Sequence, residues 1–297
     1  GRVGVALQPL VDRLILHLLQ GRVLHADETP VAQLDPGSGK TQRAYLWAYR
    51  SNDFELGPRI IVFDYQTSRS GNHVQNFLNK WQGHLLVDDY SGYKALFSKT
   101  ASPCTELGCW AHARRKFFDL HQANASTIAF EALQRIGKLY AVEAEGKHSS
   151  TEARQILRAE KSLPILQSLH DWLLQTRFHT ADGGGTAKAI DYTLKRWQSL
   201  IRYASSGYLP IDNNPVENTI RPIALGKKNW LFTGSERAGK RAAAIQTLLG
   251  TAKLNGLNPA QWLVNTLEKL PTWPNSRIDE LLPLAPDAIE VLLKECG

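Results

Sequence analysis

The stretch Leu209-Pro-Ile-Asp-Asn-Asn-Pro-Val-Glu-Asn-Thr-Ile-Arg-Pro222 gathers acidic, amide and basic side chains around a predicted helix start. Asn214 suits the N-cap, Pro215 suits the first helical position, and Glu217 stands three residues after the cap, where a glutamate reaches back to the cap amide. This pattern favours a structural role for Glu217. The alternative makes Glu217 a metal ligand on the first turn of a helix that faces carboxylates from elsewhere in the chain, so the remaining sequence has to decide between the two.

Strand patterns precede this stretch. Residues 3–20 have the apolar spacing of an amphipathic helix, and short strands are predicted at 23–30, 43–49 and 59–64, with a turn at 36–39. Three strands joined by short connections predict an antiparallel meander. A helix at 73–81 and a strand at 83–90 then indicate a crossover with parallel pairing, and residues 105–110 form a plausible fifth strand before a basic helix that runs from 112 to about 122.

Strand signals stop between residues 126 and 206, where helices are predicted around 127–145, 151–175 and 186–204. Further helices are expected at 235–255 and 259–270. The sequence therefore predicts an opening helix (1–20), the first part of an α/β core (21–125), an all-α insertion (126–206), a second core part with the glutamate helix (207–270) and a tail (271–297).

The composition limits the class of protein. A chain of 297 residues with 43% hydrophobic content can bury a full core, and a net charge of +7 favours an anionic partner, most commonly nucleic acid, over a basic protein without one. Three cysteines without a paired C-x-x-C indicate a reducing cytoplasm. No apolar run approaches the roughly 18 residues of a membrane span. The absence of methionine, even at position 1, predicts that the chain is part of a longer protein.

Carboxylates follow the predicted strands. Asp27 ends the first, Asp88 or Asp89 ends the fourth, and with Glu217 they would supply the oxygen ligands that suit Mg²⁺ or Mn²⁺. Two such ions can support phosphodiester chemistry. Asp27 has a plainer interpretation, because it could cap a loop. Side chains alternate along a strand, so at most one of Asp88 and Asp89 can face the metals. Asp64, which ends the third strand, is a weaker candidate ligand.

Two basic groups could contact phosphates. Arg114, Arg115 and Lys116 are consecutive on the basic helix, while Arg221, Lys227 and Lys228 accompany Trp230 after the opening stretch. The plainer interpretations are a solvated helix face for the first group and a core position for Trp230, or more readily for Phe232. Cys109 and His112 resemble half of a zinc site, but without a second half a packing role is favoured.

Five motifs carry a family resemblance, in the order His25-Ala-Asp-Glu-Thr-Pro30, Val87-Asp-Asp-Tyr-Ser-Gly-Tyr93, Gly108-Cys-Trp-Ala-His-Ala-Arg-Arg-Lys-Phe117, Asp212-Asn-Asn-Pro-Val-Glu-Asn-Thr-Ile-Arg-Pro222 and Lys228-Asn-Trp-Leu-Phe-Thr-Gly-Ser235. From about residue 20 to 270 the chain resembles the transposases of the insertion-sequence-66 family of bacterial mobile elements. The resemblance implies an RNase H-like core, a mixed five-stranded sheet with flanking helices, interrupted by the all-α insertion. It also implies the DDE triad Asp27, Asp88 and Glu217 holding two Mg²⁺ ions, with Mn²⁺ as a substitute. Asp89 then occupies a position where the family has glycine.

The resemblance implies an activity and partners. We expect metal-dependent DNA cleavage followed by strand transfer of an insertion sequence. The partners would be double-stranded DNA, as terminal inverted repeats and as target, a second copy of the chain when the ends are synapsed, and accessory proteins of the same element. The expected location is the bacterial cytoplasm, at the nucleoid and not at a membrane. The alternatives are a catalytically silent DNA-binding relic and a domesticated scaffold protein.

Overall fold

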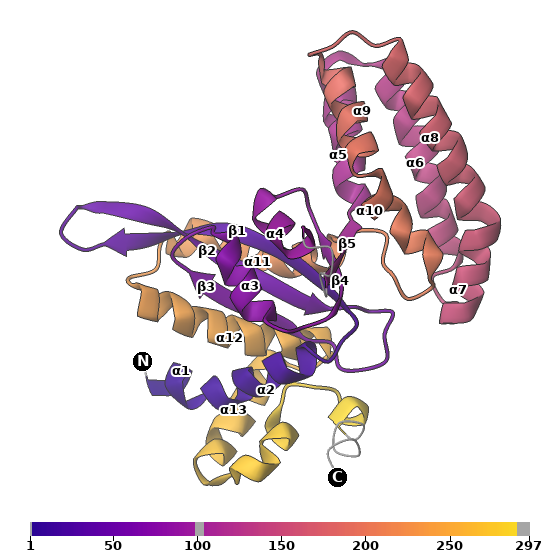
Figure 1. Cartoon of the computed structure of the whole chain (residues 1–297). Coiled ribbons are helices and arrows are strands. Elements are labelled where there is room, and N and C mark those ends of the chain that lie inside the picture. The colour runs from indigo at the N-terminus through magenta and orange to yellow at the C-terminus, as the bar shows by residue number, and fades with distance from the viewer. Residues whose placement is uncertain (1, 99–103, 290–297) are drawn as a thin grey trace. The chain divides into compact units, whose positions relative to one another are not determined.

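The computed structural model describes residues 2–98 and 104–289 (Figure 1). The chain divides into two compact units. The first comprises Gly1–Leu85, Tyr90–Thr105 and Pro215–Gly297, and the second comprises Leu86–Asp89 and Glu106–Asn214. Among the described residues, no helix is both long and apolar enough to cross a membrane.

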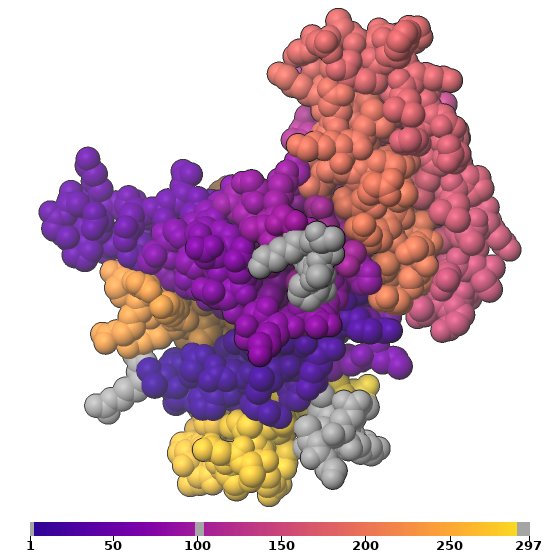
Figure 2. Space-filling model, in the orientation of Figure 1, coloured from indigo at the N-terminus to yellow at the C-terminus, as the bar shows by residue number. Residues whose placement is uncertain are grey.

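The fold is α/β and contains one five-stranded mixed sheet in the order β3-β2-β1-β4-β5. The strands are β1 (Val23–Asp35), β2 (Lys40–Ser51), β3 (Ile61–Gln66), β4 (Gly83–Val87) and β5 (Cys104–Gly108). The first three form the predicted antiparallel meander. The tip of the β1–β2 hairpin, whose turn contains Gly37 and Gly39 at positive φ, projects from the rest of the first unit (Figure 2).

Strand β1 is longer than the sequence predicts. The Asp27-Glu-Thr-Pro30 run suggests the end of a strand, yet pairing with β2 continues without interruption as far as Asp35, opposite Lys40. On its far half, β1 also gains Thr233, which pairs in parallel with Gln33. Pairing on both sides overrides the local turn signal, so Asp27 lies within the strand rather than at its end.

The helices of the first unit are α1 (Arg2–Ala6), α2 (Gln8–Leu18), α3 (Gly71–Leu78), α4 (Lys94–Phe97), α12 (Glu236–Leu254) and α13 (Pro259–Lys269), with nearly all of α11 (Asn214–Trp230) and the 3₁₀ turns η1 (Ser91–Tyr93), η4 (Leu270–Thr272) and η5 (Asn275–Leu281). The helix expected at 3–20 is divided after Ala6, because Pro9 has no N–H to continue it.

Helices α11 and α12 cover one face of the β1–β3 meander. Val31, Ala48 and Phe63 on that face are buried together with Val216, Ile220 and Ile223 of α11 and Ala243 of α12. Backbone N–H groups of β3 also donate to threonine hydroxyls of α12, from Phe63 to Thr247 at 2.9 Å and from Ile61 to Thr251 at 3.2 Å. Side chains alternate along a strand, so this packing fixes which residues of β1 point toward α11.

The second unit is mainly helical, as predicted for residues 126–206. It contains α5 (Trp110–Asn124), α6 (Thr127–Glu145), α7 (Thr151–Leu157), a π-helical turn η2 (Arg158–Ser162), α8 (Leu163–Phe178), α9 (Gly185–Lys195), α10 (Trp197–Ile201) and the 3₁₀ turn η3 (Arg202–Ser205), with the longer helices side by side (Figure 1). The fully buried Arg158 pairs with Glu143 and donates to the carbonyls of Tyr203 and Leu209. One buried guanidinium thus links the helices to the chain that leads toward α11.

Candidate functional site

Asp27 faces the layer formed by α11. Asp27 lies opposite Ala48 of β2 and four positions before Val31 on β1. Side chains alternate along a strand, so Asp27 points to the same side of the sheet as Ala48 and Val31, the side that α11 and α12 bury. The side chain is half-buried, and its Oδ1 accepts the backbone N–H of Glu28 at 2.8 Å. Because the strand continues past Asp27, the interpretation of Asp27 as a loop cap at Thr29-Pro30 is wrong.

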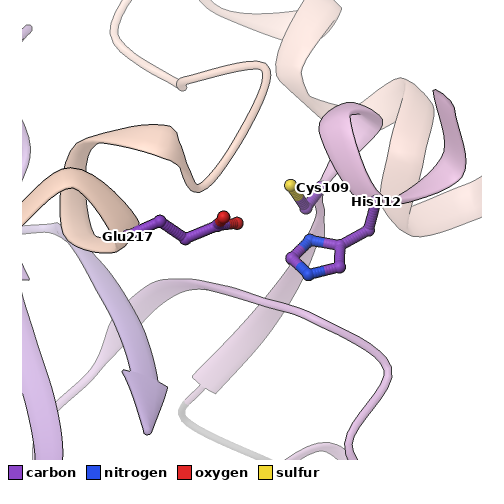
Figure 3. Close-up of side chains that lie close together, drawn as sticks. All are labelled: Cys109, His112 and Glu217. Carbon is purple, nitrogen blue, oxygen red and sulfur yellow. The ribbon is translucent and has the colours of Figure 1, made fainter. Parts of the chain in front are cut away.

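Glu217 lies in the first turn of α11 (Figure 3). Its neighbour Val216 is completely buried against the sheet, Glu217 itself is half-buried, and its Oε1 is shielded from solvent. Asp27 and Glu217 therefore belong to the same unit and to the same side of the sheet. Carboxylate oxygens in such a partly buried setting fit the hard ligands that Mg²⁺ prefers.

The predicted N-cap, Asn214, is already part of helix α11, which begins at this residue. The backbone N–H of Asn214 donates to Asp212 Oδ1 at 3.0 Å, and its side-chain amide donates to Asp212 Oδ2 at 2.8 Å. Asn214 is thus the first helical residue rather than the cap, because Asp212 holds its polar groups from the preceding turn.

Two neighbouring aspartates, Asp88 and Asp89, follow β4. Both belong to the second unit, and Asp88 follows directly on Val87, the last residue of β4. Asp89 forms an ion pair with Arg196 at 2.6 Å, and Arg196 also approaches Glu106 at 2.8 Å. The Arg196 pair engages Asp89 within its own unit, and the choice of Asp88 as the metal ligand stays a prediction.

Asp64 lies on the opposite face of the sheet from Asp27. It pairs with Trp47, which in turn pairs with Glu28, whereas Asp27 belongs to the alternate set. Burial raises the pKa of the Asp64 carboxyl, and hydrogen bonds from Gln66 partly oppose that effect. Asp64 therefore faces away from the layer that contains Glu217, in agreement with its lower rank as a candidate ligand.

Cys109 and His112 lie at the beginning of α5 in the second unit (Figure 3). The Cys109 sulfur and a ring nitrogen of His112 are within 4.8 Å of each other. Cys109 is buried, and its sulfur accepts the backbone N–H of Asn213 at 3.2 Å, while the N–H of Trp110 donates to Ile211 O at 3.1 Å. These bonds fix residues 211–213, directly before α11, to the start of α5, which supports the predicted packing role.

The predicted phosphate-binding residues divide between the units. Arg114, Arg115 and Lys116 form an exposed face of α5 in the second unit, whereas Arg221, Lys227 and Lys228 belong to α11 in the first. The Lys227 ammonium donates to the Pro30 carbonyl at 3.1 Å. Trp230 is 41% exposed and so is Phe232, so the interpretation of these aromatic residues as core is wrong.

A buried polar cluster next to Asp27 was not predicted from the sequence. Glu28 points to the face opposite Asp27, where it pairs with Arg69 and accepts the Tyr93 hydroxyl at 2.7 Å. The Arg69 guanidinium also stacks 3.7 Å from the ring centroid of Tyr90. The cluster connects β1, which carries Asp27, to the turn that follows the Asp88 segment. No local signal in the sequence reveals these partners, which are 41 and 65 residues from Glu28.

Comparison with known proteins places the chain in a family. The model described as "Transposase IS66 family" matches residues 1–241, and the model "IS66 C-terminal element" matches residues 247–284. The chain is therefore a member of the IS66 transposase family, as the motif resemblance implies.

Similar proteins of Sinorhizobium fredii carry no functional name. The uncharacterized protein y4qI is 39% identical over 97% of this chain, and the uncharacterized protein y4hP is 34% identical over 95%. The matches cover 56% and 54% of those two proteins, so the chain spans about half the length of the curated relatives that it matches.

Proposed function

We propose that this chain is the catalytic part of a DDE transposase with an RNase H-like core, which cleaves DNA at the ends of an insertion sequence and transfers the strands to a target. The observation that carries the proposal is the uninterrupted register of β1 with β2. It points Asp27 to the sheet face that α11 covers, and the first turn of α11 carries Glu217. Membership of the IS66 transposase family supplies the reaction class.

The carboxylates of Asp27, Asp88 and Glu217 would hold two Mg²⁺ ions, or Mn²⁺ as a substitute. When bound, such ions activate the attacking oxygen and stabilise the leaving oxygen of a phosphodiester. The protein contributes rigidity. Asp27 lies in a strand paired along its length, and Val216 anchors the first turn of α11 beside Glu217.

The exposed cations of the chain support DNA as its partner. Arg114, Arg115, Lys116, Arg221 and Lys228 are exposed, and with Lys227 they would contact phosphates of double-stranded DNA, as end and as target. Phosphate contacts of this kind make affinity fall steeply with salt. Joining two ends at once requires two active sites, so we expect a homo-oligomer on synapsed DNA, with accessory proteins of the same element as further partners.

Strand transfer on an oligonucleotide that carries the ends of the encoding element tests the proposal. Asp27→Asn and Glu217→Gln should each reduce the product at least a hundredfold in Mg²⁺, because either change removes an anionic ligand. Asp35→Asn is the matched control, since Asp35 is an exposed aspartate at the tip of the same strand, and it should retain full activity. Activity near wild type in both ligand variants contradicts the triad, and DNA binding without any metal-dependent cleavage would identify a relic.

A further inference from the structure

The segment Trp230-Leu-Phe232, which follows directly on the basic end of α11, presents three consecutive apolar side chains to solvent. Their exposed fractions are 41% for Trp230, 63% for Leu231 and 41% for Phe232. Runs of three exposed apolar residues are avoided on protein surfaces unless they meet a partner. We call residues 230–232 the apolar tip.

The backbone of the apolar tip is fixed. Leu231 has φ of +60°, a left-handed conformation that a leucine disfavours and that persists where the surroundings impose it. The N–H of Leu231 donates to Lys227 O at 2.9 Å, which closes the last turn of α11. Beyond the tip, the N–H of Thr233 donates to Ala32 O and the N–H of Leu34 donates to Thr233 O, both at 2.8 Å. Hydrogen bonds therefore hold the backbone at both ends of the tip, and the exposed side chains extend from a backbone that is already ordered before a partner binds.

Exposed cations flank the apolar tip in the sequence. Arg221 and Lys228 are exposed on α11, and Arg237 is exposed at the start of α12. The one acidic residue in this segment, Glu236, is paired with Lys240 at 2.7 Å. A partner of this surface must therefore combine negative charge with flat apolar faces.

Nucleic acid with exposed bases has that combination. In an intact duplex the base faces are stacked inside, and an aromatic side chain must pay for unstacking to reach them. At a frayed end, a gap or a single strand the base faces are open, so stacking there needs no such cost. We propose that Trp230 and Phe232 stack on unpaired bases at the DNA end, while Lys228 and Arg221 contact the flanking phosphates. This inference rests on the proposed function and adds to it the form of DNA that the chain recognises.

The test compares two DNA ends of equal sequence, one blunt and one with a short unpaired end that carries 2-aminopurine. Anisotropy gives the Kd of the full chain for each, and quenching of 2-aminopurine reports stacking. Trp230→Ala should weaken binding to the unpaired end about tenfold and abolish the quenching, with binding to the blunt end unchanged, whereas Trp230→Phe should retain both. Lys228→Ala should weaken both ends alike and reduce the salt dependence. Phe178→Ala, a truncation of an 85% exposed aromatic residue on α8, is the matched control and should behave as wild type.

Several outcomes overturn the inference. One is a wild-type chain that binds both ends equally without quenching; if that chain still cleaves DNA in a metal-dependent way, the proposed function stands and only this inference fails. A chain that binds neither end contradicts both. Binding of anionic vesicles that Trp230→Ala removes would assign the tip to a lipid surface, and self-association that the same change removes would assign it to a second copy of the chain. Circular dichroism of the Trp230 variants establishes that each is folded.

Discussion

Replacing Glu28 by Gln should destabilise the first unit through the buried cluster beside Asp27. The Glu28 side chain is only 1% exposed, whereas its partner Arg69 is 41% exposed. Breaking a buried ion pair costs about 3–5 kcal/mol when the remaining charge stays buried. The Arg69 charge regains water, so the loss is smaller than this range; it comes from the weakened contacts of residue 28 with the guanidinium and with the buried Tyr93 hydroxyl. We expect a loss of about 2 kcal/mol in the free energy of unfolding.

Urea unfolding followed by circular dichroism measures this change. Tyr93→Phe removes the other side of the 2.7 Å hydrogen bond, so a double-mutant cycle of the two residues should give a coupling of about 0.5–1.5 kcal/mol. Glu236→Gln is the matched control, because the Glu236–Lys240 pair is half-exposed and on one helix, and it should change stability by less than about 0.5 kcal/mol. If Glu28→Gln changes stability no more than the control does, or if the cycle shows no coupling, the cluster does not stabilise β1.

Three further predictions concern stability. Burial raises the Asp64 pKa above the ordinary aspartate value of 3.8, so the folded protein loses stability as pH rises from that value through the folded-state pKa. Asp64→Asn should therefore raise the thermal midpoint at pH 7 but not below pH 4, and a lower midpoint at pH 7 contradicts this. Burial alone would raise the pKa of Asp279, but hydrogen bonds from Arg13 and His17 lower it below 3.8. The stabilisation from this carboxylate is therefore present above pH 3.8 and is lost in acid. Asp279→Asn should lower the thermal midpoint at pH 7 and lower it less at pH 3, and equal shifts at the two pH values would count against the pairing. A methyl group on Gly239 would meet the Tyr65 ring at 2.3 Å, so Gly239→Ala should cost about 1–3 kcal/mol in urea unfolding, and a neutral result would show that the ring moves aside.

Much of the fold could be predicted because its signals are local. Alternating apolar residues and the Pro36-Gly-Ser-Gly39 turn identify the meander, and the loss of strand patterns after residue 126 identifies the helices of the second unit. The length of β1 was missed because Asp27-Glu-Thr-Pro30 resembles a turn, while its pairing partners lie elsewhere in the chain. The exposure of Phe232 was missed because an aromatic residue is usually buried.

The candidate site was predictable only in part. The family motifs give Asp27, Asp88 and Glu217, and the register of β1 adds the side of the sheet that Asp27 faces. The partners of Glu28 could not be read from the sequence, because Arg69 and Tyr93 are 41 and 65 residues away. The Asp89–Arg196 pair spans 107 residues, so no local signal in the sequence reveals it. Metal binding and the triad stay predictions.

Mn²⁺ binding to the full chain on its DNA end, measured by electron paramagnetic resonance, tests whether Asp88 belongs to the metal-binding triad. We compare wild type with Asp88→Asn and Asp89→Asn, which remove the same charge from adjacent positions. We expect wild type and Asp89→Asn to retain the bound Mn²⁺ signal, because Asp89 is engaged by Arg196, and Asp88→Asn to lose it. Loss of the signal in Asp89→Asn with retention in Asp88→Asn, or no DNA-dependent Mn²⁺ binding by the wild type, would refute the proposed triad.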